Sequence, residues 1–124
     1  MYRYDTTVDP PAAYVSVLIT NPDTKTSASL PAKIDSGAAM SVLPQTTIVE
    51  LALEPMGDIL ASGYDRRVVL LPTYDVTFEV EGHIFQDVEV TVSPRKDVLL
   101  GRDILNHFIL TLDGKNLSFD LRDP

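Results

Sequence analysis

Short segments that alternate between apolar and polar residues constrain the fold of this chain more than any other feature. The pattern is clearest at residues 14–20 (YVSVLIT), 74–80 (YDVTFEV) and 84–92 (IFQDVEVTV). Such alternation with many β-branched residues predicts half-buried strands. Only two short segments, 45–53 and 101–108, favour helix. The sequence therefore predicts an all-β protein built as a closed or partly closed barrel.

Turn residues separate further strands along the chain. A hairpin is predicted over 59–71, around the turn residues of 62–65, and it ends before the separate strand 74–80. Asp113-Gly114 is the strongest short hairpin signal and joins 109–112 to 116–121. The remaining predicted strands are 29–34, 40–43 and 98–100.

Length and composition limit what the chain can do. Its 124 residues suffice for one domain, 1–124, in which residues 1–13 form an extended leader or a dimer-interface arm. The absence of Cys excludes disulfides, thiolate nucleophiles and zinc–thiolate sites. A net charge of −8 with only ten Lys and Arg disfavours nucleic-acid binding, so no nucleic-acid partner is expected.

The sequence gives limited information on location. Residues 1–6 lack the pattern of a secretory signal, and no apolar stretch has the length of a membrane span. A cytoplasmic location is therefore expected for the chain as given. Excision from a longer precursor stays open.

Asp35-Ser36-Gly37 places an acid in a tight turn of small residues directly after an apolar segment. Taken alone, the triplet is weak evidence, because about one chain in twenty of this length would contain one by chance. A plain β-turn, with the Asp accepting from nearby amides, also explains it. A second motif at 97–105 (DVLLGRDIL) adds weight: an apolar strand runs into Gly101 and then into a helix start.

The two motifs in this order resemble those of the retropepsin-like aspartic proteases, the retroviral proteases and their cellular and bacterial relatives. The resemblance extends from Ser29 to Leu121. It implies a closed barrel with one short C-terminal helix and a flap hairpin over a cleft. It also implies cleavage of a peptide or protein substrate without a metal or other cofactor.

Hydrolysis by carboxylates alone requires two of them sharing one proton, because one activates water while the other acts as an acid. This chain has a single Asp-Ser/Thr-Gly triplet, and Asp113-Gly114 lacks the intervening hydroxyl. Asp35 must therefore meet Asp35 of a second subunit, so the predicted enzyme is a homodimer with its active site on the two-fold axis.

The resemblance also implies roles for the residues around Asp35. Ser36 would bond across the dimer axis, Gly37 would offer its carbonyl to substrate, and Ala38 and Ala39 would line the cleft floor. Many retroviral members carry a second Asp at the position of Ala39, where it pairs with the Arg of the Gly-Arg motif. The motif here is Gly101, Arg102 and Asp103, so Asp103, Asp97 or an acid of the other subunit is expected to replace the missing carboxylate.

The predicted flap tip contains Ala61, Ser62, Gly63 and Tyr64, although a plain surface hairpin explains these residues equally well. Val42 and Leu99 are the predicted cleft walls, and Leu71 is a weaker candidate. Apolar walls favour hydrophobic side chains beside the cleaved bond. Barrel packing is the simplest role for the other apolar residues of the motifs, and Leu43, Leu100 and Leu105 are predicted to be core.

Other reactive residue types lack partners in the sequence. His83 and His107 have no paired spacing that would suggest a metal site, so both are predicted to be structural or surface residues. Ser36 and Ser41 have no convincing His partner for a serine hydrolase.

Three functions are compatible with these observations. The first is a homodimeric aspartic endopeptidase. The second is a module of the same fold that holds peptides without cutting them, which Ala39 and the polar flap tip favour. The third is an unrelated small barrel with a structural role.

Overall fold

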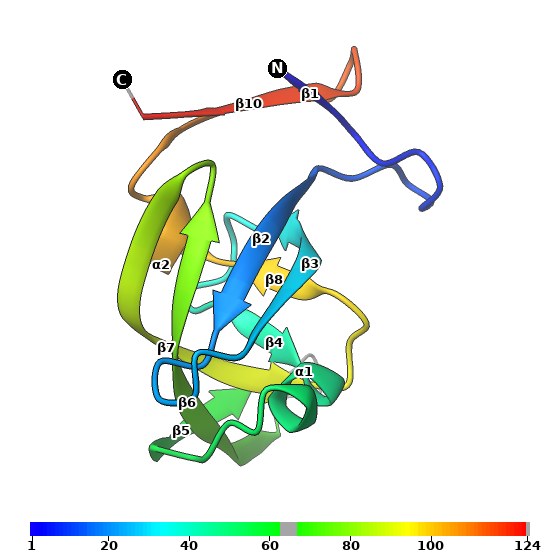
Figure 1. Cartoon of the computed structure of the whole chain (residues 1–124). Coiled ribbons are helices and arrows are strands. Elements are labelled where there is room, and N and C mark those ends of the chain that lie inside the picture. Colours follow the sequence, from blue (N-terminus) through cyan, green and yellow to red (C-terminus); the bar gives the residue numbers. More distant parts are fainter. Residues whose placement is uncertain (63–66, 124) are drawn as a thin grey trace.

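The computed structural model describes residues 1–62 and 67–123 and confirms the predicted barrel. Strand β2 pairs with both β3 and β6, and this double pairing closes the barrel in the order β2-β3-β8-β4-β7-β6. Figure 1 shows the barrel between a hairpin below and a small sheet above. The barrel strands are β2 (Tyr14–Thr20), β3 (Ser27–Ile34), β4 (Val42–Pro44), β6 (Val68–Val80), β7 (His83–Ser93) and β8 (Val98–Leu100).

Two short helices accompany the barrel. Helix α2 (Arg102–Leu105) is the predicted C-terminal helix, and α1 (Gln45–Glu50) lies within the predicted segment 45–53. Residue Ala52, just after α1, has a φ of 51°, which lies in the left-handed region and ends the helix. Both helices are anchored by apolar side chains, with Ile48 and Ile104 buried.

The predicted break between residues 71 and 74 is wrong, because β6 is one strand of 13 residues. The segment changes partner at that point: Thr73 is the last residue paired with β5 (Gly57–Ser62), and Tyr74 is the first paired with β7. Pro72 therefore has a strand neighbour on one side only. A missing N–H is tolerated in such a position.

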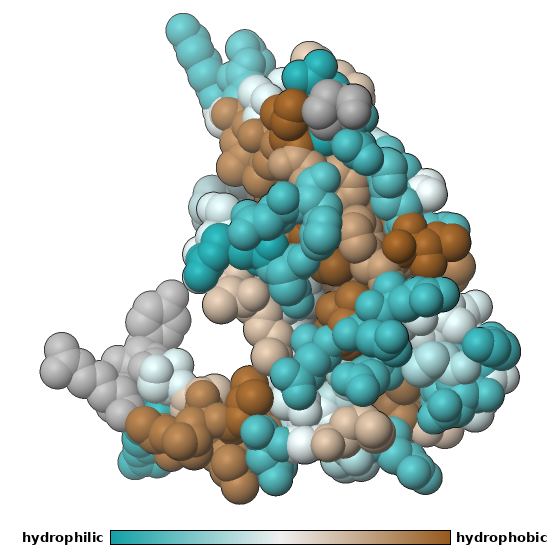
Figure 2. Space-filling model, turned by 90° about the vertical axis from the view of Figure 1, so that its left-hand side faces the viewer, coloured by the Kyte–Doolittle hydropathy of each residue, from teal (hydrophilic) through white to brown (hydrophobic). Residues whose placement is uncertain are grey.

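The β5–β6 hairpin projects beyond the barrel and carries apolar side chains. Leu60, Val68 and Leu70 are 74%, 62% and 62% exposed. Figure 2 shows the hairpin standing away from the body, with brown side chains along it and an open gap beside it. The predicted tip residues Gly63 and Tyr64 lie outside the described residues.

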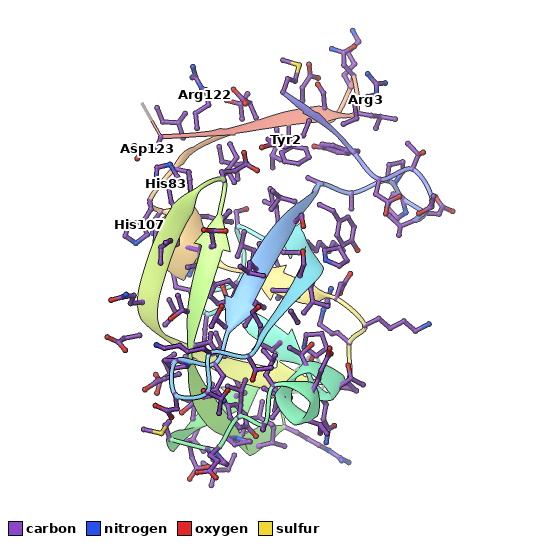
Figure 3. All side chains as sticks on the ribbon, viewed as in Figure 1. Tyr2, Arg3, His83, His107, Arg122 and Asp123 are labelled. Atoms are coloured by element: carbon purple, nitrogen blue, oxygen red, sulfur yellow. The ribbon has the colours of Figure 1, made fainter. Side chains whose placement is uncertain are left out.

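The two ends of the chain form a separate three-stranded sheet in the order β1-β10-β9. Its strands are β1 (Tyr2–Arg3), β9 (Ile109–Asp113) and β10 (Ser118–Arg122). The Tyr2 ring stacks on Phe119 with 5.0 Å between centroids (Figure 3). Residues at the start of the predicted arm, 1–13, are thereby held against the C-terminal strand.

The turn between β9 and β10 is longer than predicted. Asp113 pairs with Ser118, so the four residues 114–117 connect the strands, one more than the predicted 113–115. The Asp113 carboxylate accepts from the backbone N and the Nδ2 of Asn116 at 3.1 and 2.8 Å. Leu117 completes the turn with a φ of 51°. Side-chain hydrogen bonds within the loop thus stabilise a longer turn than the Asp-Gly dipeptide alone predicts.

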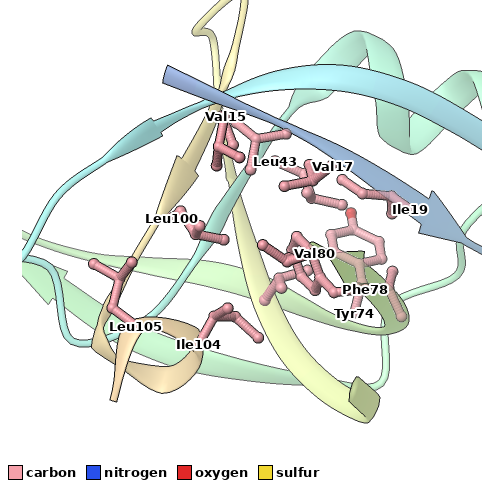
Figure 4. Close-up of a cluster of buried hydrophobic side chains, with 14 of the residues drawn as sticks. Val15, Val17, Ile19, Leu43, Tyr74, Phe78, Val80, Leu100, Ile104 and Leu105 are labelled. Carbon is pink, nitrogen blue, oxygen red and sulfur yellow. The ribbon is translucent and has the colours of Figure 1, made fainter. Parts of the chain in front are cut away.

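Inward-facing side chains of the barrel form the core drawn in Figure 4. Phe78, Leu43 and Leu100 have no exposed surface, and Leu105 is 5% exposed, which confirms the core positions predicted for the three leucines. Each such side chain stabilises the fold by about 1.5–3 kcal/mol. This core is the rigid support beneath the loop that follows β3.

That loop, residues 35–41, crosses over the end of β8. Strand β3 pairs parallel with one side of β8, and β4 pairs antiparallel with the other, so their connection passes over Gly101. A Cβ at Gly101 would lie 2.9 Å from both the carbonyl oxygen of Ala38 and the carbonyl carbon of Met40. Only glycine fits beneath the loop without displacing backbone atoms.

The substitution Gly101→Ala should therefore destabilise the protein by about 1–3 kcal/mol, as overpacking does in a tight interior. Gly114→Ala is the matched control, since a Cβ at Gly114 meets nothing within 4 Å. Urea denaturation of both variants measures the difference. Equal free energies of unfolding for the two variants would contradict this account of the crossing.

Alkaline pH should weaken the terminal sheet through Tyr2. Burial and a hydrogen bond to Glu81 raise the pKa of Tyr2 from 10.0 to about 12. Because the folded state holds this proton more tightly than the unfolded chain does, the stabilisation is complete below pH 10 and is lost as the pH rises toward 12. The free energy of unfolding of the wild type should fall in this range relative to Tyr2→Phe. A constant difference between the two proteins would refute the assignment.

Candidate active site

The predicted catalytic acid lies at the start of the loop that crosses β8. Asp35 follows the last residue of β3, is half-buried, and its backbone N donates to the Leu100 carbonyl at 3.0 Å. The parallel pairing of Ile34 with Leu100 thus continues by one hydrogen bond into the loop. Asp35 owes its position to two strands that are far apart in the sequence.

A compact turn orients the Asp35 carboxylate. Its Oδ1 accepts a hydrogen bond from the Gly37 backbone N at 2.9 Å, and its carbonyl accepts from the Ala38 N at 3.2 Å. A Cβ at Gly37 would lie 3.2 Å from Oδ1, so glycine keeps the carboxylate uncrowded. The turn leaves the other carboxylate oxygen, Oδ2, without a hydrogen bond among the described residues.

Small residues around Asp35 form an open rim. Ser36, Gly37 and Ala39 are exposed, and Ala38 is half-buried. Beside Ala39 lies a hollow of about 350 Å³, lined by residues of the same loop, of β7 and of α2. The residues that line it are Ala39, Met40, Asp87, Val88, Glu89 and Asp103.

The Gly101–Asp103 segment binds this loop, but with partners that differ from those expected. The backbone N of Arg102 donates to the Ala38 carbonyl at 2.8 Å, and its Nη1 donates to the Ser36 carbonyl at 2.9 Å. The carboxylate of Asp103 binds Ser41. Asp103 therefore does not pair with Arg102, as the acid expected at position 39 would.

Asp97 does not pair with Arg102 either. Its Oδ1 accepts from Nε and Nη2 of Arg95 at 3.1 and 2.8 Å. Burial and a hydrogen bond to the Asp97 carboxylate raise the pKa of Tyr14. The carboxylate is thus engaged with the loop before β8 and with β2, and it does not contact Arg102.

The predicted cleft walls lie together beside the loop. Val42 and Leu99 are register partners between β4 and β8, and both are half-buried. Their chain neighbours Leu43 and Leu100 point into the core. Leu71, the weaker candidate, is half-buried in β6. Of the flap residues that are described, Ala61 is half-buried and Ser62 exposed, both at the end of β5.

Sequence reasoning missed the importance of Ser41. This residue has no exposed surface, and its hydroxyl and backbone N both bond to the segment 101–103. Its partners lie some 60 residues away, so local sequence carries no signal for the interaction. The absence of exposed hydroxyl surface also removes Ser41 as a nucleophile.

Both histidines belong to one aromatic cluster away from Asp35. His83 meets Phe108 edge-on at 5.4 Å, and His107 meets Phe85 at 4.9 Å (Figure 3). His83 Nδ1 also lies 3.6 Å from an Asp123 carboxylate oxygen. Within 1–62 and 67–123, no group of three His, Cys, Asp or Glu side chains is arranged to hold a metal ion.

No helix in the described part of the chain has the length and apolarity needed to cross a membrane.

The chain matches a known protein family but no curated protein. A family model described as aspartyl protease matches residues 22–104, which include the loop 35–41 and most of α2. The family match covers more than half of the chain.

Solved structures share the fold. A retropepsin-like aspartic protease from Rickettsia conorii has 17% identity and a TM-score of 0.67, over 97% of this chain and 86% of that one. The EIAV protease in complex with the inhibitor HBY-793 has 24% identity and a TM-score of 0.61, over 77% and 86%. The simian foamy virus protease has 23% identity and a TM-score of 0.58, over 76% and 92%.

Identities this low show a common fold alone, whereas the family model extends over both sequence motifs. The chain therefore belongs to the aspartyl protease family and has the retropepsin-like fold.

Proposed function

We propose that this chain is an aspartic endopeptidase whose active site forms between two copies, with Asp35 from each. The observation that carries the proposal is the Asp35 carboxylate itself. One of its oxygens is held by the Gly37 N at 2.9 Å, on a loop fixed to β8 and α2 at several points. A carboxylate so oriented and only half-buried is available to a second carboxylate and to a water.

The proposed chemistry uses a pair of carboxyl groups that share one proton. The ionised member takes a proton from water, whose oxygen attacks the peptide carbonyl carbon, and the protonated member gives its proton to the carbonyl oxygen. In the collapse of the tetrahedral intermediate, one of its hydroxyls gives a proton to the ionised carboxylate while the protonated carboxyl gives its proton to the nitrogen, and the C–N bond breaks to release the amine and restore the singly protonated pair. The two carboxyl groups titrate as a unit in this scheme.

The small residues beside Asp35 have proposed roles that fit their exposure. The Ser36 hydroxyl bonds to the second subunit across the axis, and the Gly37 carbonyl accepts from the substrate main chain. Ala38 and Ala39 leave space for the peptide along the cleft floor. Ser36, Gly37 and Ala39 are exposed in the single chain, as groups that await a partner must be.

The terminal sheet is the proposed contact between subunits. Strand β9 is its outer strand and is hydrogen-bonded on one side only in the described part of the chain. Ile109 and Leu112 on this strand are 44% and 49% exposed. An unpaired strand edge with apolar side chains favours pairing with another strand.

Extended peptides with apolar side chains are the proposed substrates. Val42 and Leu99 form one apolar surface beside the loop. Leu60 and Leu70 are register partners in the β5–β6 hairpin, and both are exposed. An apolar enclosure excludes water and strengthens the action of the carboxyl pair.

A peptide-binding module without hydrolysis is the alternative. It is favoured by Ala39, which leaves the catalytic loop without the second acid of many retroviral relatives, and by the engagement of Arg102 with the Ser36 carbonyl. The two functions differ in a single outcome, the cleavage of a bound peptide.

Incubation with a peptide library at about pH 4 to 7, where a shared-proton pair acts, should give cleavage products. Asp35→Asn should lower kcat/KM by at least about a thousandfold, because the general base is lost. The variant should still fold, since the amide oxygen can accept from Gly37.

Asp23→Asn, the same charge change on the exposed β2–β3 turn, should retain wild-type activity. Cleavage that persists in Asp35→Asn would identify a contaminating protease. Peptide binding without cleavage by the wild type at every pH would favour the binding module.

Mixed dimers test the contribution of both subunits. When wild type and Asp35→Asn are refolded together in equal amounts, activity should fall to about one quarter of that of an all-wild-type sample, because random pairing leaves one dimer in four with two intact acids. Independent monomers would retain about one half. A value near one half would therefore refute the two-chain active site, and sedimentation would then be expected to show monomers.

A further inference from the structure

The far end of the loop 35–41 is held by an interaction that the proposed chemistry does not use. Ser41 Oγ donates to Asp103 Oδ1 at 2.7 Å and accepts from the Gly101 N at 3.0 Å. The Ser41 backbone N donates to Asp103 Oδ2 at 2.9 Å. A fully buried serine thus has both its hydroxyl and its amide paired with the segment that begins α2.

The Asp103 carboxylate accepts three hydrogen bonds in this arrangement. Besides the two hydrogen bonds from Ser41, its Oδ1 accepts from the Ile104 N at 2.9 Å. Three donors on two oxygens require a carboxylate, because an amide would turn an N–H toward one of them. The side chain is therefore placed to hold the loop, and neither of its oxygens accepts a hydrogen bond from Arg102.

Other contacts hold the loop nearer Asp35. The Asp35 N binds the Leu100 carbonyl, and Arg102 binds the carbonyls of Ser36 and Ala38. These contacts fix the beginning and middle of the loop. The contact between Ser41 and Asp103 fixes the end of the loop, just before β4. The segment between Ala38 and Ser41 is therefore held at both of its ends.

We propose that Asp103, acting through Ser41, is a positioning residue that sets the orientation of the Asp35 carboxylate and the loop floor beside it. The reaction rate falls steeply when reacting groups are displaced by fractions of an ångström. A small shift of the loop end should therefore lower the rate of catalysis even where it does not destabilise the fold. This inference rests on the proposed protease function and adds residues that the sequence motif Asp35-Ser36-Gly37 does not contain.

The test compares Asp103→Asn, Ser41→Ala and the double variant with the wild type. The amide of Asp103→Asn turns a donor toward the Ser41 N, and Ser41→Ala removes the hydroxyl with little change in volume. Each single variant should lower kcat by about 10–100-fold with KM nearly unchanged. The double variant should be no slower than the slower single one, because both remove the same link.

Readouts other than rate separate positioning from general stability. Hydrogen exchange of the Gly37 amide, which binds Asp35 Oδ1, should quicken in Asp103→Asn, and the pH profile of kcat should shift. Asp23→Asn should change neither quantity. Rates are expressed per folded molecule, with near-ultraviolet circular dichroism giving the folded fraction.

Wild-type kcat per folded molecule in both single variants would overturn the inference while leaving the protease function intact. Losses that add in the double variant would overturn it as well. If the wild type cleaves nothing, the proposed function fails, and hydrogen exchange of the Gly37 amide becomes the test of the inference. An unchanged exchange rate of this amide in Asp103→Asn and Ser41→Ala would then overturn the inference. If Asp103→Asn does not fold, Ser41→Ala carries the same measurements.

Discussion

The structure around Asp35 depends on one crossing of the chain, in which the loop 35–41 passes over the end of β8. Because β3 ends and β4 begins beside the end of β8, on opposite sides of it, the connection between them passes across that end. Backbone atoms of the loop come so close to Gly101 that no side chain fits between them. The polar groups trapped in this contact must be paired, and the Leu100–Asp103 segment pairs with Asp35, Ser36, Ala38 and Ser41. Barrel closure through β2 and β6 makes the support beneath the crossing rigid.

One substitution within the family pattern changes the use of the Gly-Arg motif. With Ala at position 39, the loop has no second carboxylate besides Asp35, and the Arg102 guanidinium binds the Ser36 carbonyl. A hydrogen bond from a charged donor to a backbone carbonyl fixes main-chain geometry. Arg102 therefore acts on the same turn that orients Asp35, whereas Ser41 is bound at the other end of the loop. In the described part of the chain, the arginine contacts a backbone carbonyl in place of the missing acid, and neither Asp103 nor Asp97 binds it.

The sequence predicted well those features that depend on local chemistry. Alternation located Tyr14–Thr20 without error, and small residues identified the turn at Asp35. Errors arose where distant partners decide. Pro72 is accommodated because β6 changes neighbours there. The turn after Asp113 is an exception, because its extra length comes with a local contact to Asn116. The partners of Asp103 and Arg102 were mistaken for a related reason: the contact of Asp103 with Ser41 spans 62 positions of sequence. No periodicity or spacing encodes such a pairing.

The proposed dimer must form between chains that each carry a net charge of −8. At physiological ionic strength, exposed charges are screened over roughly 8 Å, so only carboxylates near the contact oppose association. The β9 edge suits such a contact, because Ile109 and Leu112 expose apolar surface and the strand's free backbone groups gain hydrogen bonds on pairing. Two Asp35 carboxylates brought together would add strong local repulsion unless one takes up a proton. The shared proton that the chemistry requires is thus also a condition for assembling the site, so association and catalysis are expected to respond to pH together.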